Sequence, residues 1–284
     1  MSAEDWTAWV GRTETVTEDI SPWRVGAFAA SLDWERAPAR GEALPPGWHW
    51  LFFNPTVRRS QVGPDGHPKR GGFLPPITLP RRMWAGGRVN YLAPIPVGAD
   101  AAKHSEILKV ESKSGKSGDL TFVTVRHVVE VDGVRCVDEE QDIVYRSPPL
   151  PGASPPPKTP APQGAQWSDE VEPDEVLLFR YSALTFNGHR IHYDQPYATS
   201  EEGYPALVFH GPFTSTLLQD LAVRARPDMR LSQFSYRGAA PLFVDRAFRI
   251  EAAPVDGKPN ELSLWAKDPD GNLAMPATAV FVAK

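Results

Sequence analysis

The pattern of hydrophobic and polar positions predicts two groups of β-strands. Between residues 105 and 146 lie the runs SEILKVESKSG, DLTFVTVRHVVEV and VRCVDEEQDIVYR, joined by the turn-forming segments KSGKSGD and VDGV. After residue 230 come LSQFSYRGA, LFVDRAFRIEAAPV, ELSLWAKDP and ATAVFVA. Apolar runs bounded by Gly, Asp and Pro are typical of antiparallel strands. The chain is therefore expected to form two antiparallel sheets.

Two segments have the spacing of amphipathic helices. The later part of residues 204–223 repeats its apolar residues at helical spacing, at Phe213, Leu217, Leu218 and Leu221. Pro212 suits the first turn of this helix, where its missing N–H costs nothing. Residues 21–33 form the second candidate, which Ser21 could cap. A helix packed on an antiparallel sheet, present twice, predicts a two-layer α+β fold.

A proline-rich segment divides the chain. Residues 147–166, SPPLPGASPPPKTPAPQGAQ, have no hydrophobic periodicity and are expected to form a semi-rigid linker. It separates two domains, 1–146 and 167–284. The first domain lacks a clear central helix, because prolines and glycines interrupt residues 71–80. We expect this domain to serve as a scaffold and to contribute to ligand binding.

Composition excludes several classes of protein. The 284 residues are 41% hydrophobic and 23% charged, as expected for a globular protein. The net charge of −5 argues against a binder of nucleic acid or of a membrane surface. Cys136 is the single cysteine, so no intramolecular disulfide can form and the thiol is expected to be structural. Neither a signal peptide nor a membrane-spanning run is evident, so we expect a cytoplasmic protein.

Candidate chemistry concentrates in residues 181–198, YSALTFNGHRIHYDQPYA, after the strand-like run VLLFRYSAL. A polar loop of this kind could equally be a solvated turn. The segment His210-Gly211-Pro212, however, begins the long helix. A helix N-terminus offers free backbone N–H groups and partial positive charge, which a developing enolate oxygen requires. A glycine there also lets a ligand approach the backbone closely.

These residues resemble the hydratase-2 motif of MaoC-type enoyl-CoA hydratases. The matching pattern is Tyr181, Ser182-Ala183-Leu184-Thr185, Asn187, His192, Asp194 and Tyr197-Ala198, followed by Leu207-Val208-Phe209-His210-Gly211. It is most similar to the branch of 3-hydroxyacyl-thioester dehydratases, itaconyl-CoA hydratases and mesaconyl-C4-CoA hydratases. The resemblance implies a double hot-dog fold, in which two sheets each wrap around a central helix. It also implies a hydro-lyase that needs no cofactor.

The resemblance assigns the catalytic residues by position. His192 matches the family histidine, and Gly211 matches the glycine whose N–H holds the thioester carbonyl. Asn187 stands where the commonest motif has an aspartate, and an amide cannot take up a proton at neutral pH. We therefore expect His192 to be both acid and base, while Asn187 orients the attacking water.

Substrate contacts are expected from residues beside this motif. Arg190 could grip the distal carboxylate of a mesaconyl or itaconyl group, although a surface arginine is an equal alternative. Tyr181 and His210 belong to the same pattern, and Arg237 lies on a later strand. His189 and Asp194 are expected to stabilise the turn or to face solvent. The histidines do not have the spacing of metal ligands, so no metal site is expected.

Further cations and aromatic residues are weaker candidates. Lys69-Arg70 and Arg81-Arg82 could hold CoA phosphates. The Trp-rich stretch could line an acyl pocket, although core packing explains it better: Trp48, Trp50 and Trp84.

The resulting prediction is a homodimeric hydratase of enoyl-CoA, acting on a short branched or dicarboxylic acyl group to give a product such as citramalyl-CoA. The alternatives are a 3-hydroxyacyl-thioester dehydratase of fatty-acid type, an acyl-CoA thioesterase and a non-catalytic acyl-thioester-binding protein.

Overall fold

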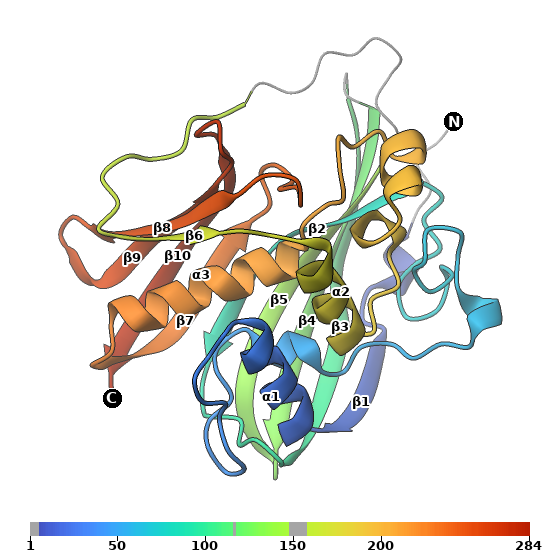
Figure 1. The fold of residues 1–284 in the computed structure, drawn as a ribbon. Helices are drawn as coiled ribbons and strands as arrows, with labels where there is room; N and C mark the ends of the chain where they lie inside the picture. Colours follow the sequence, from blue (N-terminus) through green and yellow to red (C-terminus); the bar gives the residue numbers. More distant parts are fainter. Residues whose placement is uncertain (1–5, 116–117, 148–157) are drawn as a thin grey trace.

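A computed structural model describes residues 6–115, 118–147 and 158–284, and within them ten strands form one antiparallel sheet (Figure 1). The first half of the chain contributes β1 (Thr13–Asp19), β2 (Arg81–Tyr91), β3 (Asp100–Gly115), β4 (Gly118–Val131) and β5 (Val134–Arg146). The second half contributes β6 (Trp167–Val171), β7 (Met229–Arg237), β8 (Phe248–Val255), β9 (Lys258–Lys267) and β10 (Leu273–Ala283).

The strand order shows that the two halves repeat one plan. The order is β1-β3-β4-β5-β2 in the first half and, read inward from the other edge, β6-β8-β9-β10-β7 in the second. The halves join where β2 pairs with β7, with Val89 opposite Phe234 and Gly86 opposite Arg237. The predicted pair of antiparallel sheets is therefore confirmed, and the two sheets are continuous. Strands β1, β2 and β6 were not predicted.

The long helix α3 (Gly211–Ala225) crosses the strands of the second half and packs against them (Figure 1). It matches the predicted helix and begins with Pro212 in its first turn. The second candidate helix is also confirmed as α1 (Pro22–Ser31), but Ser21 makes no side-chain capping bond. Instead the Ser21 carbonyl accepts the N–H of Val25.

One predicted strand was wrong. The run VLLFRYSAL lies in a third helix, α2 (Glu175–Leu184), which packs beside α1. Asp174 caps this helix by accepting the N–H of Leu177 at 2.6 Å. The signal was present in the sequence, because an aspartate before a glutamate is typical of a helix start. The predicted run LFVDRAFRIEAAPV is strand only from Phe248 onward.

The first half has no counterpart of α3 among its described residues, as the sequence predicted. Short 3-10 turns at Trp48–Leu51 and Arg59–Gln61, with extended chain, occupy the region before β2. Trp48 is fully buried against Phe28 of α1, so its role is packing. The main hydrophobic cluster includes residues from both halves, and it also buries Cys136.

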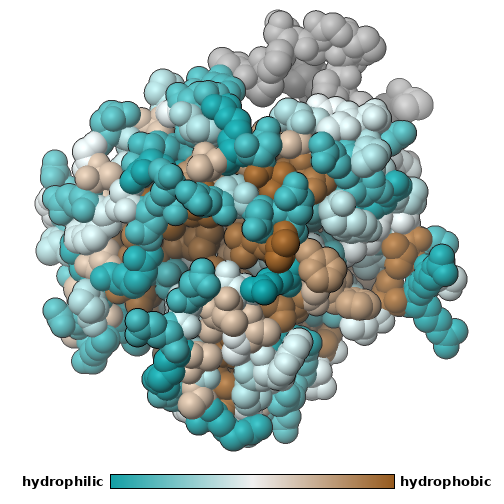
Figure 2. All heavy atoms as spheres, viewed as in Figure 1, coloured by the Kyte–Doolittle hydropathy of each residue, from teal (hydrophilic) through white to brown (hydrophobic). Residues whose placement is uncertain are grey.

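Figure 2 shows mainly polar residues on the face viewed in Figure 1, with hydrophobic ones in its recessed central part. No helix among the described residues is long and apolar enough to cross a membrane. Residues 148–157 of the proposed linker lie outside the described part, so the domain boundaries at 146 and 167 stay a prediction.

Candidate active site

The motif loop follows α2 and is shaped by its own polar groups. Asn187 donates its backbone N–H to the carbonyl of Ser182 at 2.8 Å, and its Oδ1 accepts the N–H of His189 at 3.0 Å. Phe186 adopts a left-handed conformation with φ of 50°. Asn and Asp stabilise such turns because their side chains bond the backbone two residues on. This leaves Nδ2 as the Asn187 atom able to face a ligand.

His192 ends a single 3-10 turn, Arg190–His192, and is 7% exposed. Its Nδ1 lies 2.7 Å from the carbonyl oxygen of Val208. A carbonyl can only accept, so Nδ1 carries the proton and Nε2 has the lone pair. Burial lowers the pKa of His192 to about 4, although the Val208 hydrogen bond opposes this. The imidazole is therefore neutral at pH 7 and its Nε2 can act as a base.

His210 precedes α3 and stacks on His192, with ring centroids 3.7 Å apart and an interplanar angle of 18°. Its Nε2 lies 2.9 Å from the hydroxyl of Ser182. Burial and the neighbouring His192 hold the pKa of His210 well below the ordinary value. His210, which the sequence predicted to contact substrate, thus lies beside the base. Its neutral ring packs on the His192 ring and helps to fix the orientation of His192.

Gly211 is the first residue of α3, so its N–H is one of the helix donors without an intrahelical acceptor. A Cβ built on Gly211 would lie 3.2 Å from Cε3 of Trp84. Gly211 directly follows His210, whose ring stacks on that of His192. The base and the backbone donor therefore lie close together.

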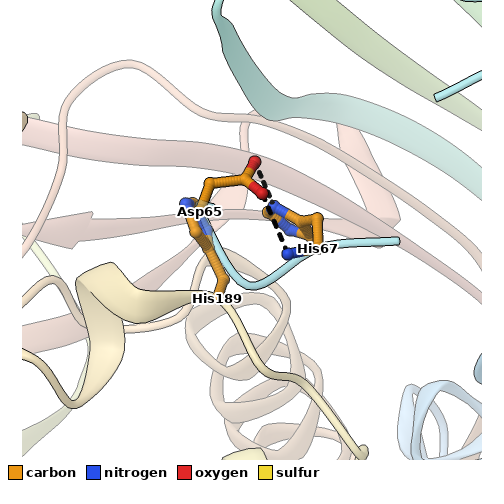
Figure 3. Close-up of side chains that lie close together, drawn as sticks. All are labelled: Asp65, His67 and His189. Carbon is orange, nitrogen blue, oxygen red and sulfur yellow. Dashed lines mark hydrogen bonds and ion pairs between the residues drawn. The ribbon is translucent and has the colours of Figure 1, made fainter. Parts of the chain in front are cut away.

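The structure also brings a segment of the first half to the motif, which the sequence did not predict (Figure 3). Asp65 accepts hydrogen bonds from the backbone N–H of His67 at 3.0 Å and from its Nδ1 at 3.2 Å. The His67 ring contacts the ring of His189 at 4.0 Å between centroids, and His189 meets His192 edge-on at 5.4 Å. Four imidazoles, those of His67, His189, His192 and His210, therefore form a row across the site.

The electrostatics of this row favour neutral rings beside one ionised carboxylate. Burial lowers the pKa of His189 to about 2 and also lowers that of His67. Burial would raise the pKa of Asp65, but the hydrogen bonds from His67 outweigh it and hold that pKa low. The negative charge of this row therefore lies on Asp65.

Asp65, His67 and His189 are grouped as the ligands of a metal ion could be. One donor atom from each lies within 4.8 Å of the others. Two imidazoles and a carboxylate are a common ligand set for zinc or iron. However, His67 donates a hydrogen bond to each oxygen of Asp65, so its Nδ1 has no lone pair for a metal, and the His67 ring packs against that of His189. The residues fit a carboxylate–imidazole pair better than a metal centre.

The segment that carries Asp65 docks tightly on the motif. The Asp65 carbonyl accepts the N–H of Arg190 at 2.9 Å, and the Arg190 guanidinium donates to the Pro64 carbonyl at 3.0 Å. A Cβ on Gly66 would lie 1.7 Å from the carbonyl oxygen of Gly188, so only glycine permits this approach. The sequence signal was the turn-like PDGHP, but nothing local indicates what it contacts.

Arg190 is held both by its own loop and by the docked segment of the first half. It forms an ion pair with Asp194 at 2.8 Å and lies over the ring of Tyr197 at 4.1 Å. Asp194 also accepts the N–H of Tyr197, so it stabilises the loop as expected. These contacts favour the alternative of a structural arginine over a grip on the acyl carboxylate.

The remaining predicted residues lie at different depths. Tyr181 is in α2 and is 3% exposed, stacked on Phe213 at 4.5 Å, and burial raises its pKa. Arg237 is exposed at the end of β7. Arg70 donates to backbone carbonyls of the first half, and Arg81 pairs with Glu202 at 3.3 Å. Tyr181 therefore belongs to the packing around the site.

Comparison with known proteins decides the family. The model of hydroxyacyl-thioester dehydratase type 2 matches residues 47–244, which include both the docked segment and the motif. The chain belongs to the hydroxyacyl-thioester dehydratase type 2 family. It is 47% identical to the mesaconyl-C(4)-CoA hydratase of Chloroflexus aurantiacus over 279 residues, which covers 98% of each chain. The resemblance seen in the motif is thereby confirmed.

Solved structures confirm the fold. A MaoC-like dehydratase from Phytophthora capsici superposes with a TM-score of 0.68 at 13% identity, covering 96% of this chain and 97% of that one. A protein from Mycobacterium tuberculosis, described as a double hot-dog fold, superposes with a TM-score of 0.58 at 13% identity and covers 96% of each chain. The family enzyme described here is therefore a double hot-dog with one complete and one remodelled half.

Proposed function

We propose that this enzyme adds water reversibly to the double bond of an enoyl-CoA whose acyl group is short, branched and dicarboxylic, as in mesaconyl-C4-CoA. The observation that carries the proposal is the neutral His192, whose Nδ1 is bound by Val208 and whose Nε2 is left as a base beside the N-terminus of α3. The 47% identity to a mesaconyl-C(4)-CoA hydratase supports the choice of acyl group.

In the proposed reaction, His192 Nε2 takes a proton from water as the water oxygen bonds to the β-carbon of the enoyl group. The π electrons of the double bond move toward the thioester, and the negative charge collects on its carbonyl oxygen. The protonated His192 then returns its proton to the α-carbon, which restores the thioester. One proton and one hydroxyl are added, so no redox cofactor is needed.

Gly211 stabilises the intermediate in this proposal. Its N–H is directed by the helix, and the partial positive charge of the α3 N-terminus favours an oxyanion there. Such a donor typically contributes about 3 kcal/mol to the transition state. Asn187 would orient the water through Nδ2, because its Oδ1 holds the loop.

Hydration is measured directly as the loss of enoyl-thioester absorbance with mesaconyl-C4-CoA, and citramalyl-CoA is the expected product. Release of free CoA at the rate of substrate loss would instead identify a thioesterase. Binding of the substrate without either reaction would identify a non-catalytic thioester-binding protein.

The assembly and location of the enzyme are also part of this proposal. We expect a homodimer acting in the cytoplasm. Size-exclusion chromatography with light scattering measures the mass, and a monomer of 31.3 kDa would contradict the dimer.

A further inference from the structure

Helix α3 buries polar side chains where a core helix usually has apolar ones. Its buried polar residues are at most 2% exposed: Thr214, Ser215, Thr216 and Gln219. The hydroxyls of Thr214 and Thr216 donate to backbone carbonyls one turn earlier, which satisfies them. The Ser215 hydroxyl and Gln219 Nε2 have no partner among the described residues. A buried polar group without a partner is costly, so it points to a ligand or to water.

The unpaired groups of Ser215 and Gln219 lie on the same face of α3 as Gly211. Ser215 and Gln219 follow Gly211 at intervals of four residues, which places them on one side of a helix. This side faces β2. Gly211 adjoins Trp84 of that strand, and Gln219 Oε1 accepts the hydroxyl of Tyr91 near the strand's other end.

The opposite wall carries unpaired groups as well. The Tyr236 hydroxyl lies over Gly87, midway between Trp84 and Tyr91, where a Cβ would approach it to 2.5 Å. Tyr236 is 6% exposed, and its ring lies 4.5 Å from that of Trp84. Neither the Tyr236 hydroxyl nor Trp84 Nε1 has a partner among the residues described. Trp84 turns its Cε3 edge to Gly211, so Nε1 lies on the far side of the ring.

The chemistry of these groups defines the ligand. An indole N–H can only donate, and the two hydroxyls can also donate. A group with several acceptor atoms and no donor fits all three. We propose that Trp84, Ser215 and Tyr236 form a subsite for the free carboxylate of a dicarboxylic acyl-CoA. This inference rests on the proposed function and names the residues that select its substrate.

The position of the subsite agrees with the length of the acyl group. Ser215 lies four residues beyond Gly211, just over one helical turn and a rise of about 6 Å. With the thioester oxygen at Gly211, the carboxylate of a four-carbon trans-enoyl chain reaches the next turn. The methyl branch then faces the rings of Trp84 and Trp50, whose centroids are 5.2 Å apart.

The charge of a buried carboxylate is stabilised here without an ion pair. Several hydrogen bonds to a carboxylate favour its ionised form, and the N-terminus of α3 adds partial positive charge. Glu139 and Asp142 are the acidic groups that act on Tyr236, and Arg88 is the positive one. The oxygens of Glu139 accept hydrogen bonds from His49 at 3.0 Å and from Trp50 Nε1, which stabilise the charge of Glu139 itself.

Binding of saturated substrate analogues tests the subsite without relying on hydration. The matched pair is 2-methylsuccinyl-CoA, esterified at C4, and isovaleryl-CoA, in which a methyl group replaces the carboxylate. By calorimetry we expect the wild-type enzyme to bind the first at least about a hundredfold more tightly. Equal affinities would overturn the subsite. Absence of mesaconyl-C4-CoA hydration with this selectivity intact would instead overturn the proposed function alone.

Two variants locate the selectivity. We expect Tyr236→Phe and Ser215→Ala each to weaken 2-methylsuccinyl-CoA binding by about tenfold, with isovaleryl-CoA binding unchanged. The free Tyr236→Phe and Ser215→Ala enzymes should melt at the same temperature as wild type or higher, because each loses an unpaired buried hydroxyl. Equal loss of affinity for both analogues would assign these residues to packing.

Ser232→Ala is the matched control. The Ser232 hydroxyl donates to the carbonyl of Val280 at 2.9 Å, away from the subsite. We expect this variant to melt at a lower temperature and to keep both affinities. A shift in selectivity from Ser232→Ala equal to that from Ser215→Ala would contradict the assignment.

Discussion

His192 donates its Nδ1 proton to the carbonyl oxygen of Val208 at 2.7 Å. Val208 in turn donates its N–H to the carbonyl of Ile191 at 3.0 Å, so the contact ties the motif loop to the chain that leads into α3. The same two bonds fix the tautomer of the base and its position beside Gly211. Such a backbone acceptor does what a carboxylate does for many catalytic histidines.

Replacing His192 with Ala should lower kcat by about a thousandfold, because general acid–base catalysis contributes on that order. The rate of mesaconyl-C4-CoA hydration and the far-ultraviolet circular dichroism spectrum are the measurements. His104→Ala is the control, since His104 is exposed on β3, where it contacts the Thr15 hydroxyl at 3.0 Å and lies 3.7 Å from Glu130. Wild-type rates from His192→Ala would remove His192 from the mechanism.

The pH profile should report a base that is already neutral. Because burial lowers the pKa of His192 to about 4, kcat/KM should stay level as pH falls from about 8 to 5. Activity is lost only where His192 becomes protonated, near pH 4. The profile is measured with brief incubations and a check that activity recovers at pH 7. A half-maximal point near about pH 6.5 would indicate an exposed, unperturbed histidine.

Asn187→Asp should keep the loop intact, because a carboxylate oxygen can accept the His189 N–H as the amide oxygen does. The variant loses the Nδ2 donor, so we expect kcat to fall by about tenfold. Asn187→Ala removes both Oδ1 and Nδ2, so its kcat should fall further. Steady-state kinetics on the two variants decide this, and wild-type rates in both would exclude Asn187 from the site.

Arg190→Ala should reduce hydration of mesaconyl-C4-CoA and crotonyl-CoA by the same factor. Its guanidinium is committed to Asp194 and to the Pro64 carbonyl, so the change loosens the loop rather than the grip on a carboxylate. The ion pair is partly exposed, so its loss should lower stability only slightly. A loss confined to the dicarboxylic substrate, seen in parallel kcat/KM measurements, would restore Arg190 as its receptor.

Chelation should leave turnover unchanged. Both oxygens of Asp65 accept hydrogen bonds from His67, so these two side chains are held together without a metal ion. The measurement is hydration before and after dialysis against a chelator, with metal content followed by emission spectrometry. Loss of activity that one divalent metal restores would show that Asp65, His67 and His189 do bind a metal.

Local patterns carried much of the fold and part of the site. Each of these segments buries one face, and the spacing of its own apolar residues shows which face that is. This is seen as alternation in β3, β4 and β5 and as helical spacing in α3. The short edge strands β1 and β6 lack that signal, because none of their residues is buried. Helix α2 was missed because its many apolar residues obscured the helical period, although Asp174 indicated its start.

By itself, the sequence determined that His192 and Gly211 belong to one motif, and that the first half keeps its sheet without a long central helix. Only the tertiary structure decided which nitrogen of His192 is the base, because Val208 supplies the acceptor from 16 residues away. It likewise showed that the Arg190 guanidinium donates to the carbonyl of Pro64, which lies 126 residues earlier in the first half. Spacing along a chain specifies which face a residue occupies, whereas the partner on that face depends on how distant segments pack.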